Sequence, residues 1–249
     1  MRTFYLPPKT KSLAGNYLSL KIGPHKVRCP YFQNITHRRT TPVLGGKGLP
    51  EEIEKEALKL FNQRKKPLTK FSPNKVRTYM VIGGLGVDCS GLVTNLLNSF
   101  LLEKKLGPLW KQIKYPSLNP LRLTIFRLRP RLNISAEILT HSLNTIFLKD
   151  FNQVRPGDLL KVGEGHVALV SEVEIDNKKK VKRIGYLHST SDYLEQHGVR
   201  EGNIFTNKQE KPLESQKWDE QYRGQNWMLE DYLAAPPAKR GFRRLKILS

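Results

Sequence analysis

Cysteine is scarce in this sequence, which has Cys29 and Cys89 as its two thiols among 249 residues. Two cysteines provide no disulfide framework of the kind that holds small secreted domains together. Long apolar runs are also lacking, since stretches such as 167–170 are far shorter than the roughly 20 residues that cross a bilayer. No apolar segment with a small-residue cleavage site follows Met1. We therefore expect no transmembrane segment and a cytoplasmic location, with non-Sec export as the alternative.

Acidic residues are few as well. The chain has 22 Asp and Glu against 43 Lys and Arg, which gives a net charge of +21 and a pI of about 10.0. Such an excess attracts polyanions, for example nucleic acid or an anionic surface. The cations are spread along the whole chain rather than gathered in one tail, so a lineage-wide bias in composition explains the excess equally well. The charge indicates one class of partner to test and says nothing about the fold.

The spacing of proline and glycine divides the chain into two parts. Residues 1–46 are predicted to form an N-terminal extension without chemistry of its own, with one weak strand over 17–22. Residues 47–249 are predicted to form a single catalytic domain, which is long enough to bury a substantial core. Within this domain, a basic segment of about 103–133 is interrupted by prolines and is interpreted as an insertion.

Apolar periodicity predicts helices early in the catalytic domain and strands later. Helices are expected over 50–64, where a proline and acidic residues suit a helix start, and over 88–102 and 135–148. Strands are expected over residues 158–162, 166–173, 181–188, 199–205 and 242–248. Helices followed by strands favour an α+β fold, in which helices pack on one face of an antiparallel sheet.

Cys89 lies at the first turn of the second predicted helix, after a glycine-rich loop over 83–86 and the N-cap candidate Asp88. The positive end of a helix favours a thiolate over a thiol, so this position is expected to lower the cysteine pKa below its usual value of about 8.5. Backbone N–H groups at a helix start also bind an oxyanion. The alternative is a small buried residue beside a tight turn, because a cysteine nucleophile needs a histidine elsewhere.

Two histidines occupy the ends of predicted strands. His166 follows a glycine turn and begins an apolar strand, which gives a general base rigid support and an accessible imidazole. His188 ends the next strand, and the two histidines lie on opposite sides of the turn at 176–177. If these strands pair antiparallel, both imidazoles lie at the same end of the sheet, where His188 orients His166. The alternative for His166 is a structural histidine at a sheet edge.

The blocks around these residues resemble those of one enzyme family. The run Asp88-Cys89-Ser90-Gly91-Leu92-Val93 is similar to the nucleophile signature of the NlpC-type papain-like cysteine peptidases. Further blocks that resemble this family lie at 156–159, 166–170, 187–189 and 241–244. The resemblance covers about residues 75–248.

The resemblance implies a papain-like NlpC-type core, in which the nucleophile helix packs against the antiparallel sheet that carries the histidines. It also implies a triad of Cys89, His166 and His188. Such a triad hydrolyses amide bonds in peptides, and in this family the substrates are usually peptidoglycan-type peptides with gamma-glutamyl or D-amino-acid linkages. We therefore expect a peptide or peptidoglycan-like substrate.

Three further residues are expected on the oxyanion and substrate side of the site. Tyr79 resembles the family tyrosine near the oxyanion hole, Asp88 is expected chiefly as the helix cap, and Ser90 is expected to be chiefly structural. We expect no cofactor and no metal. Two histidines and a cysteine within 25–37 are spaced by four and eight residues, which matches no strong zinc pattern.

The rival function is the binding of nucleic acid or another polyanion by a papain-like core without activity. Its support is the net charge and a predicted insertion in which cations alternate with aromatic rings, since such surfaces hold phosphates and stack on bases. These residues are Lys104, Lys105, Lys111, Lys114, Arg122, Arg127, Arg129 and Arg131, with Trp110, Tyr115 and Phe126. No recognised nucleic-acid-binding motif accompanies them.

Overall fold

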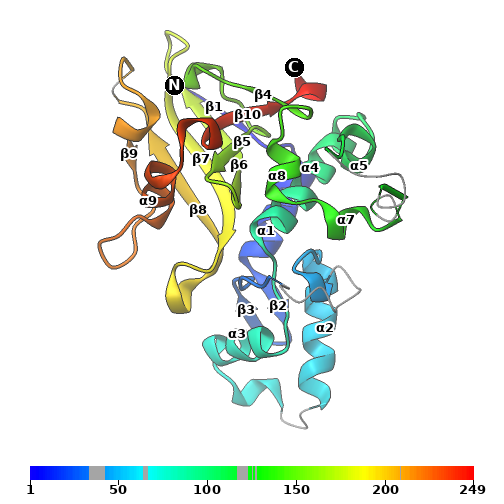
Figure 1. Cartoon of the computed structure of the whole chain (residues 1–249). Helices are drawn as coiled ribbons and strands as arrows, with labels where there is room; N and C mark the ends of the chain where they lie inside the picture. The colour runs from blue at the N-terminus through cyan, green and yellow to red at the C-terminus, as the bar shows by residue number, and fades with distance from the viewer. Residues whose placement is uncertain (34–42, 64–66, 117–122, 125, 127, 208) are drawn as a thin grey trace.

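The computed structural model describes residues 1–249 apart from 34–42, 64–66, 117–122, 125, 127 and 208. Its centre is an antiparallel sheet (Figure 1). The strands of this sheet are β1 (Arg2–Tyr5), β4 (Thr145–Phe147), β5 (Leu159–Val162), β6 (His166–Ile175), β7 (Val181–Thr190), β8 (Gly198–Phe205), β9 (Lys217–Trp218) and β10 (Gly241–Leu245). A separate hairpin pairs β2 (Leu20–Ile22) with β3 (His25–Val27).

Helices surround the sheet. They are α1 (Pro8–Leu18), α2 (Pro50–Gln63), α3 (Pro73–Ile82), α4 (Cys89–Glu103), α5 (Leu109–Gln112), α7 (Pro130–Asn133), α8 (Ala136–Thr140) and α9 (Trp227–Ala234). Figure 1 shows α4, α5, α7 and α8 on one side of the sheet and α9 on the other, with α2, α3 and the β2–β3 hairpin grouped below. Among the described residues, every helix is too short or too polar to cross a bilayer.

The strands follow the order β4-β10-β5-β6-β7-β8-β9. β6 is long enough to have two neighbours on one edge, since β5 pairs with its first half and β1 pairs with its second half. β10 lies between β4 and β5, although it comes late in the chain. The antiparallel sheet confirms the predicted α+β class, and the predicted strands appear within a few residues of their expected positions.

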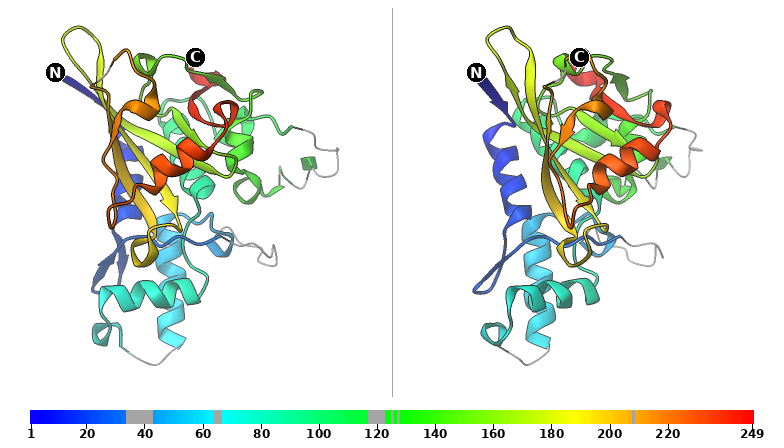
Figure 2. Two further views of the ribbon diagram at one scale, coloured as in Figure 1. Left: turned by 60° about the vertical axis from the view of Figure 1, so that its left-hand side comes forward. Right: turned by 90° about the vertical axis from the view of Figure 1, so that its left-hand side faces the viewer.

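Apolar side chains on the two faces of the sheet form two separate hydrophobic cores. Leu159, Leu169 and Leu187 are register neighbours across β5, β6 and β7, and all three belong to the cluster that contains α4. The adjacent residues Leu160 and Val170 belong to a second cluster, which includes side chains of α9. Successive side chains of a strand point to opposite faces, so both faces of this sheet are covered. The two views in Figure 2 show the same layers, and the expectation of helices on a single face is therefore incomplete.

α4 is the helix that positions the candidate nucleophile. Asp88 is its N-cap, because the carboxylate accepts a hydrogen bond from the backbone N–H of Gly91 at 2.6 Å. The helix packs on β6 and β7, and α1 packs against it from another side. Most of its residues are therefore buried, including Leu92 and Leu96, which have no exposed surface. This packing holds Cys89, the first residue of α4, beside the sheet.

Residues 1–33 belong to the main core, in contrast to the predicted extension over 1–46. β1 joins the central sheet, and the weak strand expected at 17–22 is the end of α1 followed by β2. Tyr17, Leu20 and Cys29 have no exposed surface and lie in the same cluster as α4. The segment contributes few but well-separated core residues, which do not produce a clear periodic pattern.

The third predicted helix is shorter in the structure than the expected range of 135–148. α8 begins after Ser135, whose hydroxyl accepts a hydrogen bond from the N–H of Ile138 at 3.2 Å. The side-chain amide of Asn144 donates to the carbonyl of Ile138 at 2.8 Å, which competes with continuation of the helix. The chain then continues as β4 and pairs with β10.

Tyr17→Phe tests whether the N-terminal segment stabilises the fold. The Tyr17 hydroxyl donates to the carbonyl of Gly48 at 2.7 Å and accepts from the amide of Asn95 at 2.8 Å, in the core. Its removal deletes both of these buried hydrogen bonds, so we expect the free energy of unfolding in urea to fall by about 1–3 kcal/mol. Tyr5→Phe is the matched control at a ring that is 50% exposed, with an expected change within about 0.5 kcal/mol. Equal stabilities of the two variants would contradict the structural role.

Candidate active site

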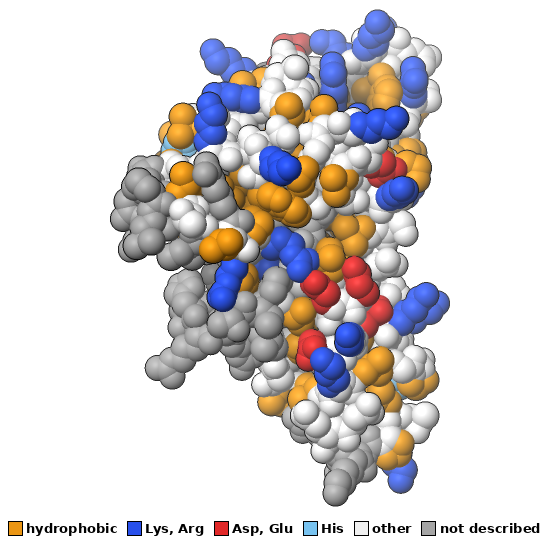
Figure 3. Space-filling view, turned by 90° about the vertical axis from the view of Figure 1, so that its right-hand side faces the viewer, with side chains coloured by type: hydrophobic (Ala, Val, Ile, Leu, Met, Phe, Trp, Pro, Cys, Tyr) orange, Lys and Arg blue, Asp and Glu red, His pale blue; other side chains and the backbone are white. Residues whose placement is uncertain are grey.

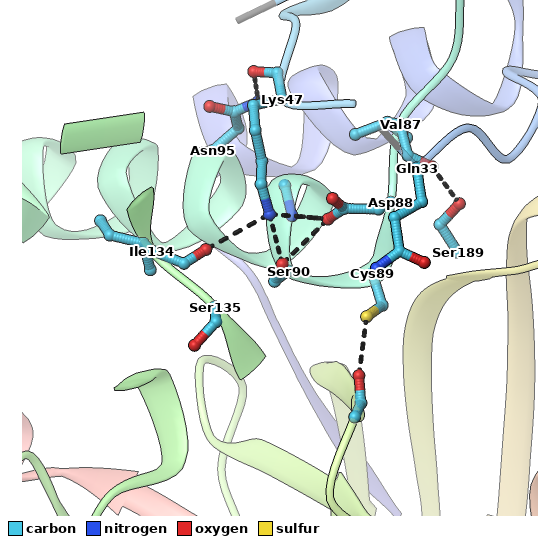
Figure 4. A network of polar contacts seen from close by, with 12 residues as sticks. Gln33, Lys47, Val87, Asp88, Cys89, Ser90, Asn95, Ile134, Ser135 and Ser189 are labelled. Carbon is cyan, nitrogen blue, oxygen red and sulfur yellow. Dashed lines mark hydrogen bonds and ion pairs between the residues drawn. The ribbon is translucent and has the colours of Figure 1, made fainter. Parts of the chain in front are cut away.

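Cys89 and His166 border the same pocket, which has a volume of about 430 Å³. Cys89 is 7% exposed, and its Sγ lies 3.4 Å from the carbonyl oxygen of Gly165. Gly165 immediately precedes His166, the first residue of β6. Figure 4 shows the Cys89 sulfur pointing toward this segment. The packing of α4 on the sheet thus brings a thiol and an imidazole to one pocket.

A chain of polar contacts runs from His166 into the protein. Nε2 of His166 lies 2.9 Å from Nδ1 of His188, and Nε2 of His188 lies 2.9 Å from both carboxylate oxygens of Glu220. The antiparallel pairing of β6 with β7 places both histidines at one end of the sheet, as the sequence predicted. His188 and Glu220 are 1% and 4% exposed, so water does not compete for these contacts.

An ionised Glu220 determines which ring nitrogens carry protons when both histidines are neutral. A carboxylate only accepts hydrogen bonds, so His188 donates from Nε2 and presents the lone pair of Nδ1 to His166. His166 then donates from Nε2 and keeps its own lone pair on Nδ1, the nitrogen that does not face His188. These proton positions follow from the hydrogen-bond network. His166 is therefore held in a tautomer that accepts a proton at Nδ1.

Glu220 is kept ionised by its surroundings. Burial opposes ionisation, but His188 and then Arg200 outweigh burial and lower the pKa of the Glu220 carboxyl to about 2. Nε of Arg200 donates to the carboxylate at 2.7 Å, and the Tyr186 hydroxyl donates to it at 3.0 Å. The Arg200 guanidinium also lies 3.7 Å from the ring centroid of Tyr193, which holds its planar group in place.

Burial controls the protonation of the thiol. It raises the pKa of Cys89 to about 12, and the charge of Asp88 is the next cause. Lys47 and two backbone N–H groups, those of Val167 and Ser90, act in the opposite direction and lower the pKa. The outcome differs from the predicted lowering of the Cys89 pKa, because the sheet covers the helix start and removes the water that would solvate a thiolate.

The imidazole of His166 is also neutral in the unliganded pocket. Burial is the largest cause and His188 the second, and together they lower the pKa of His166 to about 3. The resting site therefore contains a neutral thiol and a neutral imidazole rather than a thiolate–imidazolium pair.

Asp88 and Ser90 lie beside Cys89 and belong to the cap of α4. The Ser90 hydroxyl donates to Oδ1 of Asp88 at 2.9 Å, and the same oxygen accepts the Gly91 N–H. Both residues border the pocket. Their hydrogen bonds fit the predicted roles of a helix cap and a structural serine.

Tyr79 does not border this pocket, in contrast to its expected place near the oxyanion. Its ring packs edge-on against Phe61 and Phe71 at centroid distances of 6.0 and 5.3 Å, because that face of α3 contributes to the core. Another tyrosine, Tyr31, borders the pocket, and burial followed by the charge of Cys89 raises the pKa of its phenol. Tyr31 lies in the segment interpreted as an extension, so no family block pointed to it.

Glu220 and Arg200 were not predicted from the sequence. Arg200 lies directly opposite His188 in the register of β7 and β8, so a correct strand register would have brought it to the site. Glu220 follows β9 in an irregular segment and has no neighbouring motif. No sequence signal distinguishes it from the other acidic residues of the chain.

Carboxylates dominate the rim of the pocket. Glu137, Glu164, Asp192 and Asp231 border it, and no described Lys or Arg does so. Glu164 forms one exposed contact with Lys239 at 3.5 Å. Burial and then the charge of Asp192 raise the pKa of Asp231, which indicates closely spaced negative groups. An acidic pocket on a chain with a net charge of +21 favours cationic groups over polyanions.

No group of three or more His, Cys, Asp or Glu among the described residues is arranged to hold a metal ion. Within the weak candidate set of 25–37, Nε2 of His25 contacts the carbonyl oxygen of Leu68 at 2.9 Å. Cys29 is fully buried, and His37 lies outside the described residues.

Comparisons with protein-family models, curated proteins and solved structures found no match for this chain. The functional argument therefore depends on the residues of the pocket and their geometry.

Glu220→Gln tests the buried chain of contacts. It leaves Arg200 and His188 without an anionic partner, so we expect the free energy of unfolding near neutral pH to fall by about 3–5 kcal/mol. The folded-state pKa of Glu220 is about 2, below the value of about 4.3 for an unfolded chain. The stability that this charge confers is thus complete above the unfolded pKa and is lost as the pH falls toward 2. Unfolding measured from pH 7 to 2 should show wild type and variant converging in acid.

Glu195→Gln provides the control, because Glu195 pairs with Arg223 at the surface with both side chains more than 60% exposed. Such exposed pairs contribute little to stability, because water and salt screen them. A Glu220→Gln variant that is as stable as Glu195→Gln would show that the buried carboxylate does not organise the site.

Proposed function

We propose that this protein is a cysteine hydrolase that cleaves amide bonds, with Cys89 as nucleophile and His166 as general base. The observation that carries the proposal is the pocket that the Cys89 thiol and the His166 imidazole share. His188 and Glu220 determine which nitrogen of this imidazole carries the proton. A nucleophile, a base and an orienting group form the general arrangement of such enzymes. The packing of α4 on an antiparallel sheet that carries both histidines supports a papain-like, NlpC-type core.

In the first half of the proposed reaction, the Cys89 thiol passes its proton to Nδ1 of His166 while Sγ attacks the substrate carbonyl. The carbon–sulfur bond forms, and the electron pair of the carbonyl double bond moves to the oxygen. His166 then gives the proton to the amide nitrogen as the carbon–nitrogen bond breaks, so an amine leaves and a thioester remains. Backbone N–H groups at the start of α4 are suited to stabilise the oxyanion, and one such donor contributes about 100–1000-fold in rate.

In the second half, His166 takes a proton from water as the water attacks the thioester. Collapse of this intermediate releases a carboxylic acid and returns the proton to the sulfur. The neutral resting pair suits both halves, because His166 begins each half with a free lone pair. Protonation of His166 or of His188 would remove this arrangement, since an imidazolium at His188 donates to His166 instead of accepting from it.

The proposed substrates are peptidoglycan-type peptides, with cleavage at gamma-glutamyl or D-amino-acid linkages. This choice follows from the NlpC-type blocks around Cys89, His166 and His188. The acidic rim adds a physical reason, because stem peptides of this kind carry free amino groups that Asp192 and Asp231 would attract.

His166→Ala and Cys89→Ala test the reaction on a panel of peptidoglycan peptides with gamma-D-glutamyl and D-amino-acid bonds. Loss of a general base should lower kcat/KM by about 100–10,000-fold, and loss of the nucleophile should reduce hydrolysis to background. His141→Ala is the matched control, since His141 does not border the pocket. Released amines are measured by mass spectrometry, and turnover that survives in both variants would refute the proposed roles.

The wild type is labelled with iodoacetamide at increasing pH, and Cys89→Ala gives the background labelling. Because the pKa of Cys89 is raised to about 12, labelling of the wild type should keep rising above about pH 8.5, where an ordinary thiol levels off. A labelling rate that levels off below that pH would show a thiolate–imidazolium pair at rest and would contradict the neutral pair.

A second candidate function, polyanion binding, is favoured by a separate groove of about 730 Å³ that shares no lining residue with the Cys89 pocket. Arg2, Lys104, Arg155, Lys179 and Arg244 border this groove, and Arg244 is already paired with Asp158 at 2.8 Å. The predicted basic insertion gives less support, because Arg131 pairs with Glu52 at 2.7 Å, and Arg122 and Arg127 lie outside the described residues. Figure 3 shows Lys and Arg side chains scattered among apolar ones on that face rather than gathered in one stripe.

A salt titration with fluorescent duplex DNA tests this candidate. Binding through phosphates should weaken log-linearly with salt, and replacing Arg2, Lys104, Arg155 and Lys179 by Gln should reduce the slope by about one for each contact that is lost. The control replaces four cations outside the groove, Lys21, Lys59, Lys75 and Lys217, by Gln. Equal slopes for the two variants would show that the groove is not the binding surface.

A further inference from the structure

Lys47 is a buried cation that the proposed reaction does not use. It is 6% exposed, and its ammonium donates to Oδ1 of Asp88 at 2.8 Å and to the carbonyl oxygen of Ile134 at 3.3 Å. It also donates a short hydrogen bond to the hydroxyl of Ser90. Figure 4 shows the extended side chain reaching from the N-terminal segment to the start of α4, where these partners converge. Asp88 and Ser90 flank Cys89 in sequence.

The backbone around Lys47 is fixed to the same place. Lys47 forms an isolated bridge with Val87, and the carbonyl of Gly46 accepts the N–H of Asp88 at 2.9 Å. The chains approach so closely that a Cβ on Gly91 would lie 2.3 Å from the carbonyl oxygen of Gly46. The glycine that follows the nucleophile in the sequence motif is therefore required by this contact. Lys47 has little freedom to leave its partners.

The reason for a cation at this position is the charge of Asp88. The carboxylate is 6% exposed and caps the helix next to Cys89, so it opposes the formation of a second negative charge on the sulfur. Accordingly, Asp88 raises the pKa of the thiol and Lys47 lowers it. A buried carboxylate without a counter-ion would be costly in itself and would repel a thiolate.

We propose that Lys47 is a positioning residue for Cys89, whose buried ammonium neutralises Asp88 and so favours the thiolate that attacks the substrate. The inference rests on the proposed function, because a thiolate at Cys89 contributes to catalysis only if Cys89 is the nucleophile. Lys47 acts through Asp88 and Ser90 and does not itself touch the reacting atoms. Its role explains why a charged N-cap is compatible with a reactive sulfur at the next residue.

Other ionisable groups near Cys89 remain the same in every variant of the test. The charged or titratable residues that border the pocket with Cys89 and Asp88 are Tyr31, Glu137, Glu164, His166, Asp192 and Asp231. The Lys47 ammonium donates instead to Asp88, Ser90 and Ile134. Differences between charge variants of Lys47 and Asp88 therefore report on this pair.

The experiment measures the second-order rate of Cys89 alkylation by iodoacetamide between pH 6 and 10 in four variants of the full chain. Lys47→Met removes the charge, and Lys47→Arg retains it. Asp88→Asn removes the opposing charge while keeping a good N-cap, because Asn and Asp cap helices equally well. The double variant Lys47→Met/Asp88→Asn removes both charges. Cys29 has no exposed surface and serves as an internal control, since its labelling reports unfolding.

We expect Lys47→Met to slow alkylation of Cys89 about tenfold, the change in thiolate fraction for one unit of pKa. Asp88→Asn should speed alkylation, Lys47→Arg should stay near the wild-type rate, and the double variant should return toward it. A purely structural role predicts instead that Asp88→Asn slows alkylation and that the double variant is the slowest. If Lys47→Met labels Cys29 and is therefore unfolded, the sign of the Asp88→Asn effect still decides the matter.

The outcomes separate this inference from the proposed function. If the wild type hydrolyses no peptide but the variants follow the expected order, the proposed function fails and the electrostatic role of Lys47 stands. If the wild type hydrolyses peptides but alkylation is unchanged in Lys47→Met, or is slowed in Asp88→Asn, the inference about Lys47 is overturned.

Discussion

The structure depends on one constraint, the burial of charge at the start of α4. Asp88 caps the helix, and the packing of that helix against the sheet removes its carboxylate from water. A buried carboxylate must be paired, and its partner Lys47 comes from the segment before α2. The N-terminal part of the chain therefore cannot be separated from the pocket. Its bridge at Val87 and its buried side chains, such as Tyr17, are parts of the same arrangement.

A second buried charge is connected to His166, which borders the pocket. Glu220 is paired with Arg200 and contacts His188, which contacts His166 in turn. Cys89 and His166 are thus each connected to a buried carboxylate that is compensated by a cation. The two pairs act differently. Lys47 and Asp88 modify the charge around the Cys89 sulfur, whereas Glu220 with Arg200 determines which nitrogen of the His166 imidazole carries the proton. A pocket built in this way keeps its polar groups ordered without exposing them to solvent.

The sequence predicted those features of the structure that depend on residues close together in the chain. The cap and apolar face of α4 and the alternation of β5 to β8 were predicted, because capping and side-chain period depend on neighbouring residues. The pairing of His166 with His188 also followed from one short turn. Lys47, Tyr31 and Glu220 could not be predicted, since each is brought near Cys89 or His166 by contacts between distant segments. The raised pKa of Cys89 was missed for the same reason, because burial under the sheet outweighs the effect of the helix end.

The position of β10 has a consequence for biosynthesis. This strand, Gly241–Leu245, fills the space between β4 and β5, and it contributes Phe242 to the core on the face that α9 covers. While the ribosome is still short of residue 241, β4 and β5 each present an unpaired edge, and the apolar residues beside them are uncovered. Open edges of this kind recruit strands from other chains. Until β10 has been added, the polypeptide therefore exposes two strand edges that can pair with other chains.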